Sequence, residues 1–314
     1  MTSTATENLA PIALFVFKRP EHTRQTLASL ADNPEFNSSP LYIYCDGARN
    51  EKDLVDVEIT RDIIGSWEHP NKTIITQKIN CGLANSVIAG VTALVSQYGR
   101  VIVVEDDLVV SKYFLSYLNS ALDKYYNSRK VLQISAYMFP VAEFSDKKET
   151  MFLPFITSWG WATWSRAWEV FDAKATHWEC LLTNSETRKQ FDLGGCYDYS
   201  GMLLRQVRGE IDSWAIRWNW SVFQHNGLVI YPPTSLVKNI GFDGSGTHCR
   251  PDDFHDVRIQ ASTDQFLFSD SIEISSREYL AVKKVIKTMS GSFLVRFIKI
   301  TRSKIQRMKM VNQG

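Results

Sequence analysis

The 314-residue sequence lacks the features that define several common protein classes. Its five cysteines form no C-x-x-C pair, which favours free thiols in a reducing compartment over disulfides or a structural zinc site. No stretch reaches the roughly 18 consecutive apolar residues of a membrane-spanning helix. The sequence also has no G-x-S-x-G nucleophile elbow and no G-K-[ST] phosphate loop, which argues against serine hydrolases of that type and against a Walker-type nucleotide site.

Charge is balanced overall but unevenly distributed along the chain. There are 35 Lys+Arg and 34 Asp+Glu residues, and the resulting net charge of +1 argues against a nucleic-acid partner. Residues 279–314 nevertheless contain nine basic side chains and no acidic ones. From Phe293 onward apolar residues are interleaved with them, as in an amphipathic helix on an anionic membrane surface. Packing of that apolar side on the protein body is the alternative.

The apolar run Ile12–Phe17 has no basic residue before it, which favours a buried strand over a signal peptide. Together with the free thiols, this run predicts a cytoplasmic protein. The basic segment places it at the inner face of the cell membrane as a peripheral protein.

Apolar runs and helical repeats alternate through the first half of the chain. Continuous apolar strands separated by helices predict an α/β fold with a mostly parallel sheet covered on both faces. In such a sheet, ligands bind at the carboxyl ends of the strands. Six of the nine tryptophans form two clusters in the second half, which we expect to be a loop-rich substrate region sharing the same core. We expect strands at 11–17, 41–45, 73–76, 101–104 and 131–136, and helices at 21–30, 82–98 and 111–126.

Three consecutive acids, Glu105, Asp106 and Asp107, directly follow the apolar run Val101–Val104. Carboxylates at the end of a buried strand are costly unless something compensates their charge. A Mg²⁺ or Mn²⁺ ion with oxygen ligands supplies that compensation and commonly binds substrate phosphates as well. A helix N-terminus also favours acids, but one acid is enough there. The triplet therefore predicts a metal site.

Polar residues also end the other expected strands. Asp46 can accept a hydrogen bond from a nucleotide base or ribose, although Asp-Gly is equally a turn signal. Arg19 can meet a diphosphate, or it can lie in solvent where a helix begins at Pro20. Gly82 allows a ligand phosphate to approach a helix N-terminus, or it is a plain cap.

The tryptophan clusters offer candidate acceptor and base residues. Trp159 and Trp161 can stack on the apolar faces of sugar rings, or they can pack as core. Asp212 lies among apolar and aromatic residues, a setting that disfavours the charged carboxylate and suits a general base. A salt bridge with Arg217 is the structural alternative.

A glycine-rich stretch at 239–248 ends in His248. It can form a lid that brings this imidazole to the metal as a distant ligand. A surface loop with an idle histidine is the alternative, and the acidic triplet elsewhere in the chain favours the ligand.

These motifs resemble the N-acetylglucosaminyltransferase I family over residues 11–250. The run 105–110, followed by Tyr113-Phe114, resembles its acidic metal motif, and Val131–Tyr137 resembles the strand that follows. Trp159-Gly160-Trp161 is similar to its acceptor-side loop, and Asp212-Ser213-Trp214 to the segment that holds its base. The resemblance implies a GT-A fold, a nucleotide-sugar donor (usually a UDP-sugar), a Mn²⁺ or Mg²⁺ ion and inversion at the anomeric carbon.

The resemblance also implies roles for individual residues. Ser213 stands where the family has a second acid, so Asp212 is the remaining candidate for the base. His248 is similar in position to the C-terminal metal-binding histidine of GT-A enzymes in general. The other implied roles are metal binding by Asp107, donor contacts by Arg19, Asp46 (to uracil), Gly82 and Asp106 (near the ribose or sugar), and acceptor contacts by Trp159, Trp161 and Trp214.

The sequence therefore predicts a metal-dependent inverting glycosyltransferase that builds a surface glycan on a glycan or lipid-linked acceptor. We expect a GT-A domain at 1–278, with a donor half at 11–137 and an acceptor half at 138–278, followed by a basic tail at 279–314. A non-catalytic sugar-binding protein is one alternative, and it predicts a dispensable acidic triplet. A nucleotidyltransferase is another, although Phe17–Pro20 lacks the glycines of its phosphate loop.

Overall fold

The computed structural model describes residues 9–243 and 266–290. Their centre is an eight-stranded sheet in the order β3-β2-β1-β4-β8-β6-β9-β7. Strands β1 to β4 are parallel to one another, β6 is parallel to β9, and β7 and β8 run antiparallel to their neighbours. The expected α/β fold, with a mostly parallel sheet flanked by helices, is confirmed.

The strands of the first half lie where the apolar runs predict them. All five residues of β1 and of β6 are buried, as is usual for strands covered on both faces. Strand β3, at the edge of the sheet, is only partly buried. The bounds are β1 Ile12–Val16, β2 Leu41–Cys45, β3 Lys72–Thr76, β4 Arg100–Glu105 and β6 Val131–Ser135.

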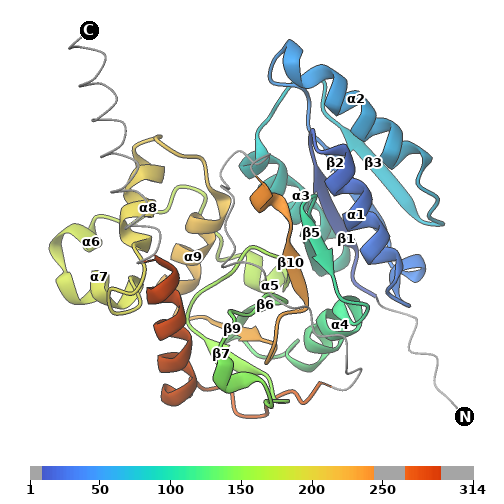
Figure 1. Cartoon of the computed structure of the whole chain (residues 1–314). Coiled ribbons are helices and arrows are strands. Elements are labelled where there is room, and N and C mark those ends of the chain that lie inside the picture. The colour runs from blue at the N-terminus through green and yellow to red at the C-terminus, as the bar shows by residue number, and fades with distance from the viewer. Residues whose placement is uncertain (1–8, 244–265, 291–314) are drawn as a thin grey trace, which may run out of the picture.

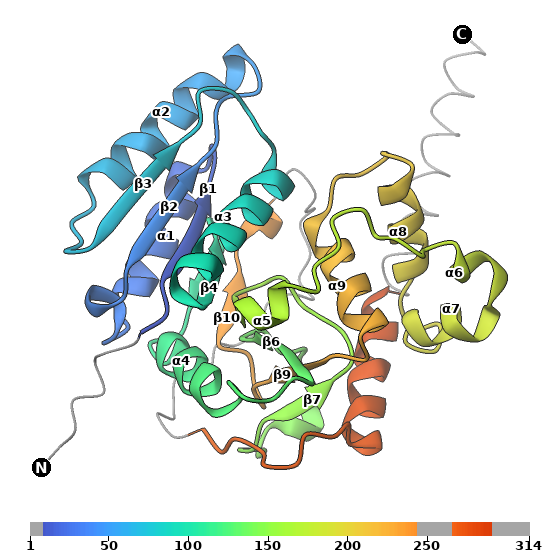
Figure 2. The same cartoon turned by 180° about the vertical axis from the view of Figure 1, so that it is seen from behind.

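Helices cover both faces of this half. Helices α1 and α2 lie in front of strands β1–β3 in Figure 1, and α3 lies on the opposite face in Figure 2. Helix α3 ends at Gly99, whose left-handed backbone (φ +75°) suits glycine. Helix α2 has no counterpart among the expected helices. The bounds are α1 Pro20–Ala31, α2 Glu51–Ser66, α3 Leu83–Tyr98 and α4 Phe114–Lys124.

The second half is more regular than the loop-rich region we expected. It supplies three strands to the main sheet and one strand, β10, that pairs with β5 in a separate two-stranded sheet. Its strands are β7 Met151–Leu153, β8 Trp161–Trp164, β9 Leu228–Tyr231 and β10 Val237–Asn239, whereas the partner of β10, β5 Leu108–Val110, belongs to the first half. Its helices are α5 Ser165–Trp168, α6 Cys180–Thr183, α7 Ser185–Phe191, α8 Tyr199–Val207 and α9 Trp214–Gln224, with the short 3₁₀ helices η2 Ala142–Phe144 and η3 Gly241–Asp243. In the first half, the 3₁₀ helix η1 Phe36–Ser38 comes before β2.

The main hydrophobic core contains residues of both halves, in agreement with the shared core that we expected. A helix at 276–290, dark red in Figure 1, packs on it through Val282 and Ile286, which are 0% and 3% exposed. The amphipathic segment expected from Phe293 lies outside the described residues. Within 9–243 and 266–290, no helix combines the length and the apolar character needed to cross a bilayer.

Candidate active site

The candidate site lies where four strands bring their polar flanking residues to one edge of the sheet. Strands β1, β2 and β4 end there because they are parallel. The antiparallel strand β8 begins there, since Trp161 pairs with Val103 near the end of β4. Arg19 after β1, Asp46 after β2, Asp107 after β4 and Trp159 before β8 therefore share one edge, as the topology predicts.

An ion pair joins the ends of β1 and β4. The Arg19 Nη1 atom lies 2.8 Å from Asp107 Oδ2 and 3.7 Å from Asp106 Oδ1. The Phe17 amide donates to Asp106 Oδ2 at 3.1 Å, and the Thr26 hydroxyl donates to the Asp106 carbonyl at 2.8 Å. Since the side chains of Arg19, Asp106 and Asp107 are all less than one-fifth exposed, the guanidinium is a close counter-charge to both carboxylates.

Burial and mutual repulsion raise the pKa of the other two acids of the triplet. Removal from water, followed by repulsion from Asp107 and Asp106, raises the pKa of Glu105 to about 8. The same causes, with Asp107 as the repelling charge, raise the pKa of Asp106 to about 7. A hydrogen bond from the Trp214 side chain opposes the rise at Glu105.

These pKa shifts predict how stability depends on pH in metal-free protein. Because the folded-state pKa of Glu105 exceeds its ordinary value of 4.5, its contribution to the unfolding free energy falls as pH rises from about 4.5 to about 8. A neutral Glu105→Gln variant escapes this loss. We expect the variant to gain stability over the wild type between pH 5 and pH 8, as measured by urea unfolding in EDTA. The exposed control Glu169→Gln should show a flat difference, and a flat difference for Glu105→Gln would contradict the pKa shift.

One atom of the site fits a cation. Asp107 Oδ1 is buried and has no hydrogen-bond partner among the described residues, whereas Oδ2 pairs with Arg19. No group of three or more His, Cys, Asp or Glu side chains in the described part of the chain is arranged to hold a metal. Asp107 can therefore supply one ligand, and a complete shell requires others, such as substrate phosphates or water. His248, the other expected ligand, lies outside the described residues.

Gly241, which follows β10, packs directly against the ion pair between Arg19 and Asp107. We did not predict this contact from the sequence. A Cβ atom here would lie 2.4 Å from Asp107 Oδ2 and 3.0 Å from Arg19 Nη1. The preceding residue, Ile240, donates its amide to the Asp107 carbonyl at 2.8 Å. We singled out this glycine-rich stretch in the sequence because of His248. In the described structure, the stretch contributes Gly241, whose missing side chain leaves room for the ion pair between Arg19 and Asp107.

Replacing Gly241 by alanine should therefore displace the Asp107 carboxylate. We expect a loss of about 1–3 kcal/mol in unfolding free energy, the usual cost of forcing extra volume into a packed site. Gly65→Ala is the matched control, because its Cβ would meet nothing within 4 Å on helix α2. That change should be neutral or stabilising by up to about 1 kcal/mol. Equal unfolding midpoints for the two variants in urea would contradict the predicted clash.

Asp46 organises the loop that starts α3. Its Oδ1 accepts from the amides of Gly47 (2.9 Å) and Cys81 (2.8 Å), and its Oδ2 accepts from the Asn80 side chain and the Gly82 amide, both at 2.9 Å. Gly82 has φ +83°, a left-handed conformation that suits glycine. The bonds favour a positioning role for Asp46, and its predicted contact with uracil stays a prediction.

Asp212 reaches the same edge, but not in the apolar setting we expected. Its side chain is 56% exposed, and its Oδ1 accepts from Arg217 Nη2 at 2.8 Å, so the structural alternative of a salt bridge is present. Its Oδ2 would lie 3.8 Å from a Cβ atom at Gly82. The carboxylate thus faces the start of α3. Asp198, another acid of the second half, caps α8 by accepting from the Gly201 amide.

The three candidate acceptor tryptophans differ in exposure. Trp161 and Trp214 are 0% and 3% exposed and stack on each other with centroids 5.0 Å apart. Direct sugar contact by these two is therefore wrong in this structure, and they pack as core. Trp159 is partly exposed and meets Tyr137 and Phe242 edge-to-face at 4.5 and 5.5 Å. Trp159 is the remaining candidate for stacking on an acceptor.

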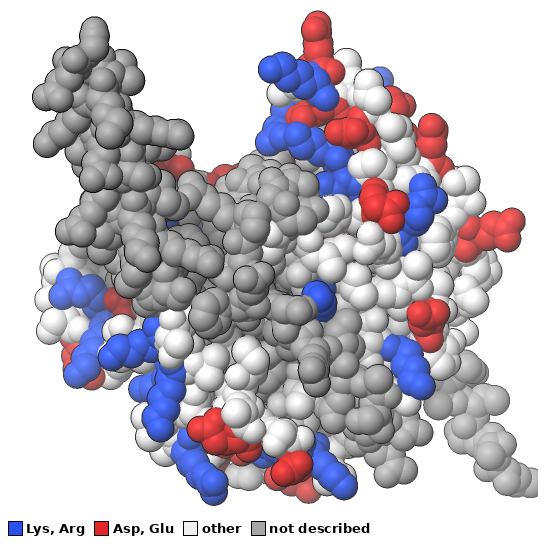
Figure 3. All heavy atoms as spheres, in the orientation of Figure 1, with Lys and Arg blue, Asp and Glu red and all other residues white. Residues whose placement is uncertain are grey.

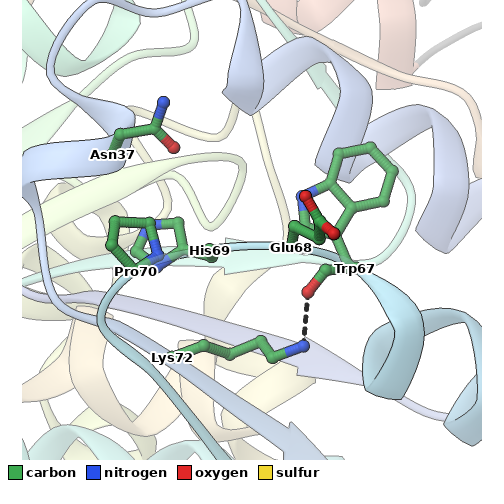
Figure 4. Close-up of a pocket in the computed structure, with 6 residues that line it drawn as sticks. All are labelled: Asn37, Trp67, Glu68, His69, Pro70 and Lys72. Carbon is green, nitrogen blue, oxygen red and sulfur yellow. Dashed lines mark hydrogen bonds between the residues drawn. The ribbon is translucent and has the colours of Figure 1, made fainter.

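A surface hollow elsewhere has a structural explanation. Figure 4 shows it between η1 and the α2–β3 connection. Lys72 Nζ donates to the carbonyls of Ile64 and Gly65 at 2.8 and 3.0 Å and also to that of Trp67, so it caps the end of α2. The His69 ring bonds the Phe36 carbonyl at 3.0 Å. These polar groups serve the fold, and we assign no ligand to the hollow.

Comparison with known proteins gives fold-level likenesses only. No protein-family model matches the chain, and no curated protein matches it. Similar solved structures include a mannosyltransferase from Pyrobaculum calidifontis in complex with GDP-mannose and Mn²⁺ (TM-score 0.34, 11% identity, 54% of this chain, 48% of that chain). Mouse xyloside xylosyltransferase 1 matches with a TM-score of 0.37 and 12% identity, over 70% of this chain and 83% of that chain. An Anaerococcus prevotii 4-diphosphocytidyl-2C-methyl-D-erythritol synthase matches with a TM-score of 0.31 and 13% identity, over 52% of this chain and 73% of that chain. The chain thus spans about half the length of the mannosyltransferase, and the resemblance to the N-acetylglucosaminyltransferase I family rests on its motifs.

Proposed function

We propose that this protein is a metal-dependent inverting glycosyltransferase of the GT-A type, which transfers a sugar from a UDP-sugar to an acceptor hydroxyl. One observation carries the proposal. The acidic triplet at the end of β4 meets Arg19 from β1, and the buried Asp107 Oδ1 has no hydrogen-bond partner among the described residues. Such a cluster of opposite charges suits a diphosphate with its cation. The domain boundaries expected above, a GT-A domain at 1–278 and a tail at 279–314, form part of this proposal.

The donor side of the proposed site uses Arg19, Asp107 and the start of α3. The Arg19 guanidinium binds diphosphate oxygens, which it can do bidentately. Asp46 fixes the loop 80–82, so that the N-terminus of the 16-residue helix α3 faces the anion. A divalent cation held by Asp107 would neutralise charge on the departing diphosphate. Asp106 is the candidate for a contact with the ribose or the sugar.

The acceptor side uses Asp212 as general base. Arg217 holds its Oδ1, and its Oδ2 faces the start of α3, next to the donor loop. Asp212 accepts the proton of the acceptor hydroxyl while that oxygen attacks the anomeric carbon. The bond to the diphosphate breaks as the new glycosidic bond forms, and this single displacement inverts the configuration. Trp159 stacks on the acceptor sugar.

The test is release of UDP from a panel of UDP-sugars in the presence of Mn²⁺, with and without simple glycoside acceptors. We expect UDP release that depends on the acceptor for at least one donor. For Asp212→Asn we expect the rate of this release to fall at least about 10²-fold, in keeping with loss of a general base. Glu210→Gln is the matched control, because this acid is on the same loop and pairs only loosely with Arg208, at 3.9 Å. Equal rates for the two variants would exclude Asp212 as the base. Sugar binding without turnover would favour a sugar-binding protein.

We also propose that the basic tail docks the enzyme on anionic membranes, where a lipid-linked acceptor resides. Six of the nine basic residues of 279–314 lie beyond residue 290. Removing residues 291–314 should leave the core intact, because Val282 and Ile286 pack before that point. We expect the truncated protein to lose co-sedimentation with phosphatidylglycerol vesicles and to keep the UDP release of the full chain. Undiminished co-sedimentation would contradict the docking role.

A further inference from the structure

A cavity of about 410 Å³ lies between α7, α9 and the helix 276–290. It also borders the start of β9 and the residues that follow β7. Because β9 is parallel to β6, and β6 and β4 are both antiparallel to β8, the start of β9 lies at the sheet edge opposite to Asp107. Figures 1 and 2 agree in placing the helix 276–290 beside β7, β9 and α9. The cavity is therefore separate from the candidate active site.

Most of the cavity wall is aromatic or aliphatic. Phe155, Phe191, Leu193 and Phe223 line it, and the first three of these are at most 2% exposed. The volume of the cavity lies within the range of small-molecule pockets, which are mostly apolar with a few placed polar groups. The wall suits a flat ring or a short chain.

One buried polar group in this wall has no hydrogen-bond partner within residues 9–243 and 266–290. Asn219 on α9 is 2% exposed, and its Oδ1 accepts from the Ile156 amide at 3.0 Å. Its Nδ2 is buried and has no hydrogen-bond partner among the described residues, although Asn219 lines the cavity. Leaving a buried donor unsatisfied costs about 1–3 kcal/mol. A ligand oxygen in the cavity would satisfy it.

Two lysines give the cavity a cationic side. Lys189 comes from α7 and Lys283 from the helix 276–290, and neither ammonium has a carboxylate partner within the described residues. Lys283 Nζ lies 4.7 Å from the centre of the Tyr279 ring, which also lines the cavity. The single acid of the lining, Glu186, accepts from Gln190 at 3.2 Å. Figure 3 shows Lys and Arg side chains gathered over α7 and the neighbouring helix.

We propose that this cavity is a second binding site, for a small anionic amphiphile. The ligand has an apolar ring against the phenylalanines, an oxyanion (phosphate ester or carboxylate) at Lys189 and Lys283, and a hydrogen-bond acceptor for Asn219 Nδ2. This site stands on residues that the proposed transfer reaction does not use. It can therefore exist whether or not that reaction is correct.

The test is calorimetric titration with 4-nitrophenyl phosphate, which carries a ring, a phosphate and an acceptor group. Phenyl phosphate removes the acceptor, and inorganic phosphate removes the ring as well. We expect the full probe to bind wild type at least about tenfold more tightly than inorganic phosphate does, with phenyl phosphate between them. Equal affinity for inorganic phosphate, or no binding of the full probe, would overturn the proposal.

Variants locate the bound probe. Lys283→Met should weaken binding about tenfold, whereas Lys284→Met, the next residue on the same helix and outside the lining, should stay within about twofold. Asn219→Asp keeps the acceptor for Ile156 and removes the donor, so it should also weaken binding about tenfold. If the buried Asn219→Asp change unfolds the protein, the comparison of Lys283→Met with Lys284→Met still tests where the probe binds. Displacement of the probe by excess UDP, or equal binding by both lysine variants, would place it elsewhere and overturn the proposal.

Discussion

Replacing Asp107 by asparagine should lower the rate of sugar transfer by about 10²- to 10³-fold. The change keeps the size of the side chain and removes its charge. It takes away the carboxylate whose Oδ1 has no partner in the described part of the chain, and it leaves the Arg19 guanidinium without its 2.8 Å counter-ion. Initial rates of UDP release at saturating Mn²⁺ measure the loss, and the same variant should no longer bind UDP in a Mn²⁺-dependent way.

A second Arg–Asp pair supplies the control for this variant. Arg100 and Asp123 pair at 2.5 Å at the opposite end of β4, and the Asp123 side chain is 68% exposed. Asp123→Asn therefore removes one acid from an arginine pair without touching the proposed site. If Asp107→Asn and Asp123→Asn transferred sugar at the same rate, Asp107 would not be part of the active site.

Replacing Asp46 by alanine should cost about 3–5 kcal/mol of unfolding free energy. This carboxylate is 8% exposed and accepts four hydrogen bonds, all from residues 47 and 80–82. A bond to a charged group contributes about 1.5–3 kcal/mol, and the donors left behind remain partly buried. The bonds share one loop, so their energies do not add fully. Urea unfolding measures the change.

The Asp46→Asn variant tests whether the stability depends on the charge of the side chain or only on its shape. Its single oxygen can accept two of the four bonds, but its amide group would point hydrogens at the donors on the other side. We therefore expect Asp46→Asn to recover less than half of the stability lost in the alanine variant. Asp56→Asn, an exposed acid on α2, is the control and should stay within about 0.5 kcal/mol of the wild type. Full recovery by Asp46→Asn would mean that the loop does not depend on the carboxylate.

The location of the candidate site at this edge of the sheet was predictable, because three acids directly follow a run of buried apolar residues. An apolar run such as Val101–Val104 can only be a buried strand, and three acids cannot follow it without compensation. Arg19 and Asp46 end neighbouring strands, so the parallel topology alone brings them to the same edge. What the sequence could not reveal is which carboxylate pairs with Arg19 and which oxygen is left without a partner. Those depend on side-chain rotamers set by packing.

Helix α2 and the second half show where sequence patterns were insufficient. Helix α2 leaves Leu54, Val55 and Ile59 between 43% and 67% exposed, and these apolar residues obscure the periodicity of its buried face. The strands β7 to β10 are only three or four residues long, too short for a period of two to stand out. Tryptophans are favoured in cores and in sugar sites alike, so burial of Trp161 and Trp214 needed the tertiary structure.

The central claim is that the edge formed by β1, β2 and β4 binds a nucleoside diphosphate. The most direct test is calorimetric titration of UDP into the wild-type protein with and without Mn²⁺, with GDP and CDP as controls. We expect UDP to bind in the presence of Mn²⁺ and to bind at least about tenfold more weakly without it. If the folded protein bound none of the three nucleotides under either condition, the transferase proposal would be wrong.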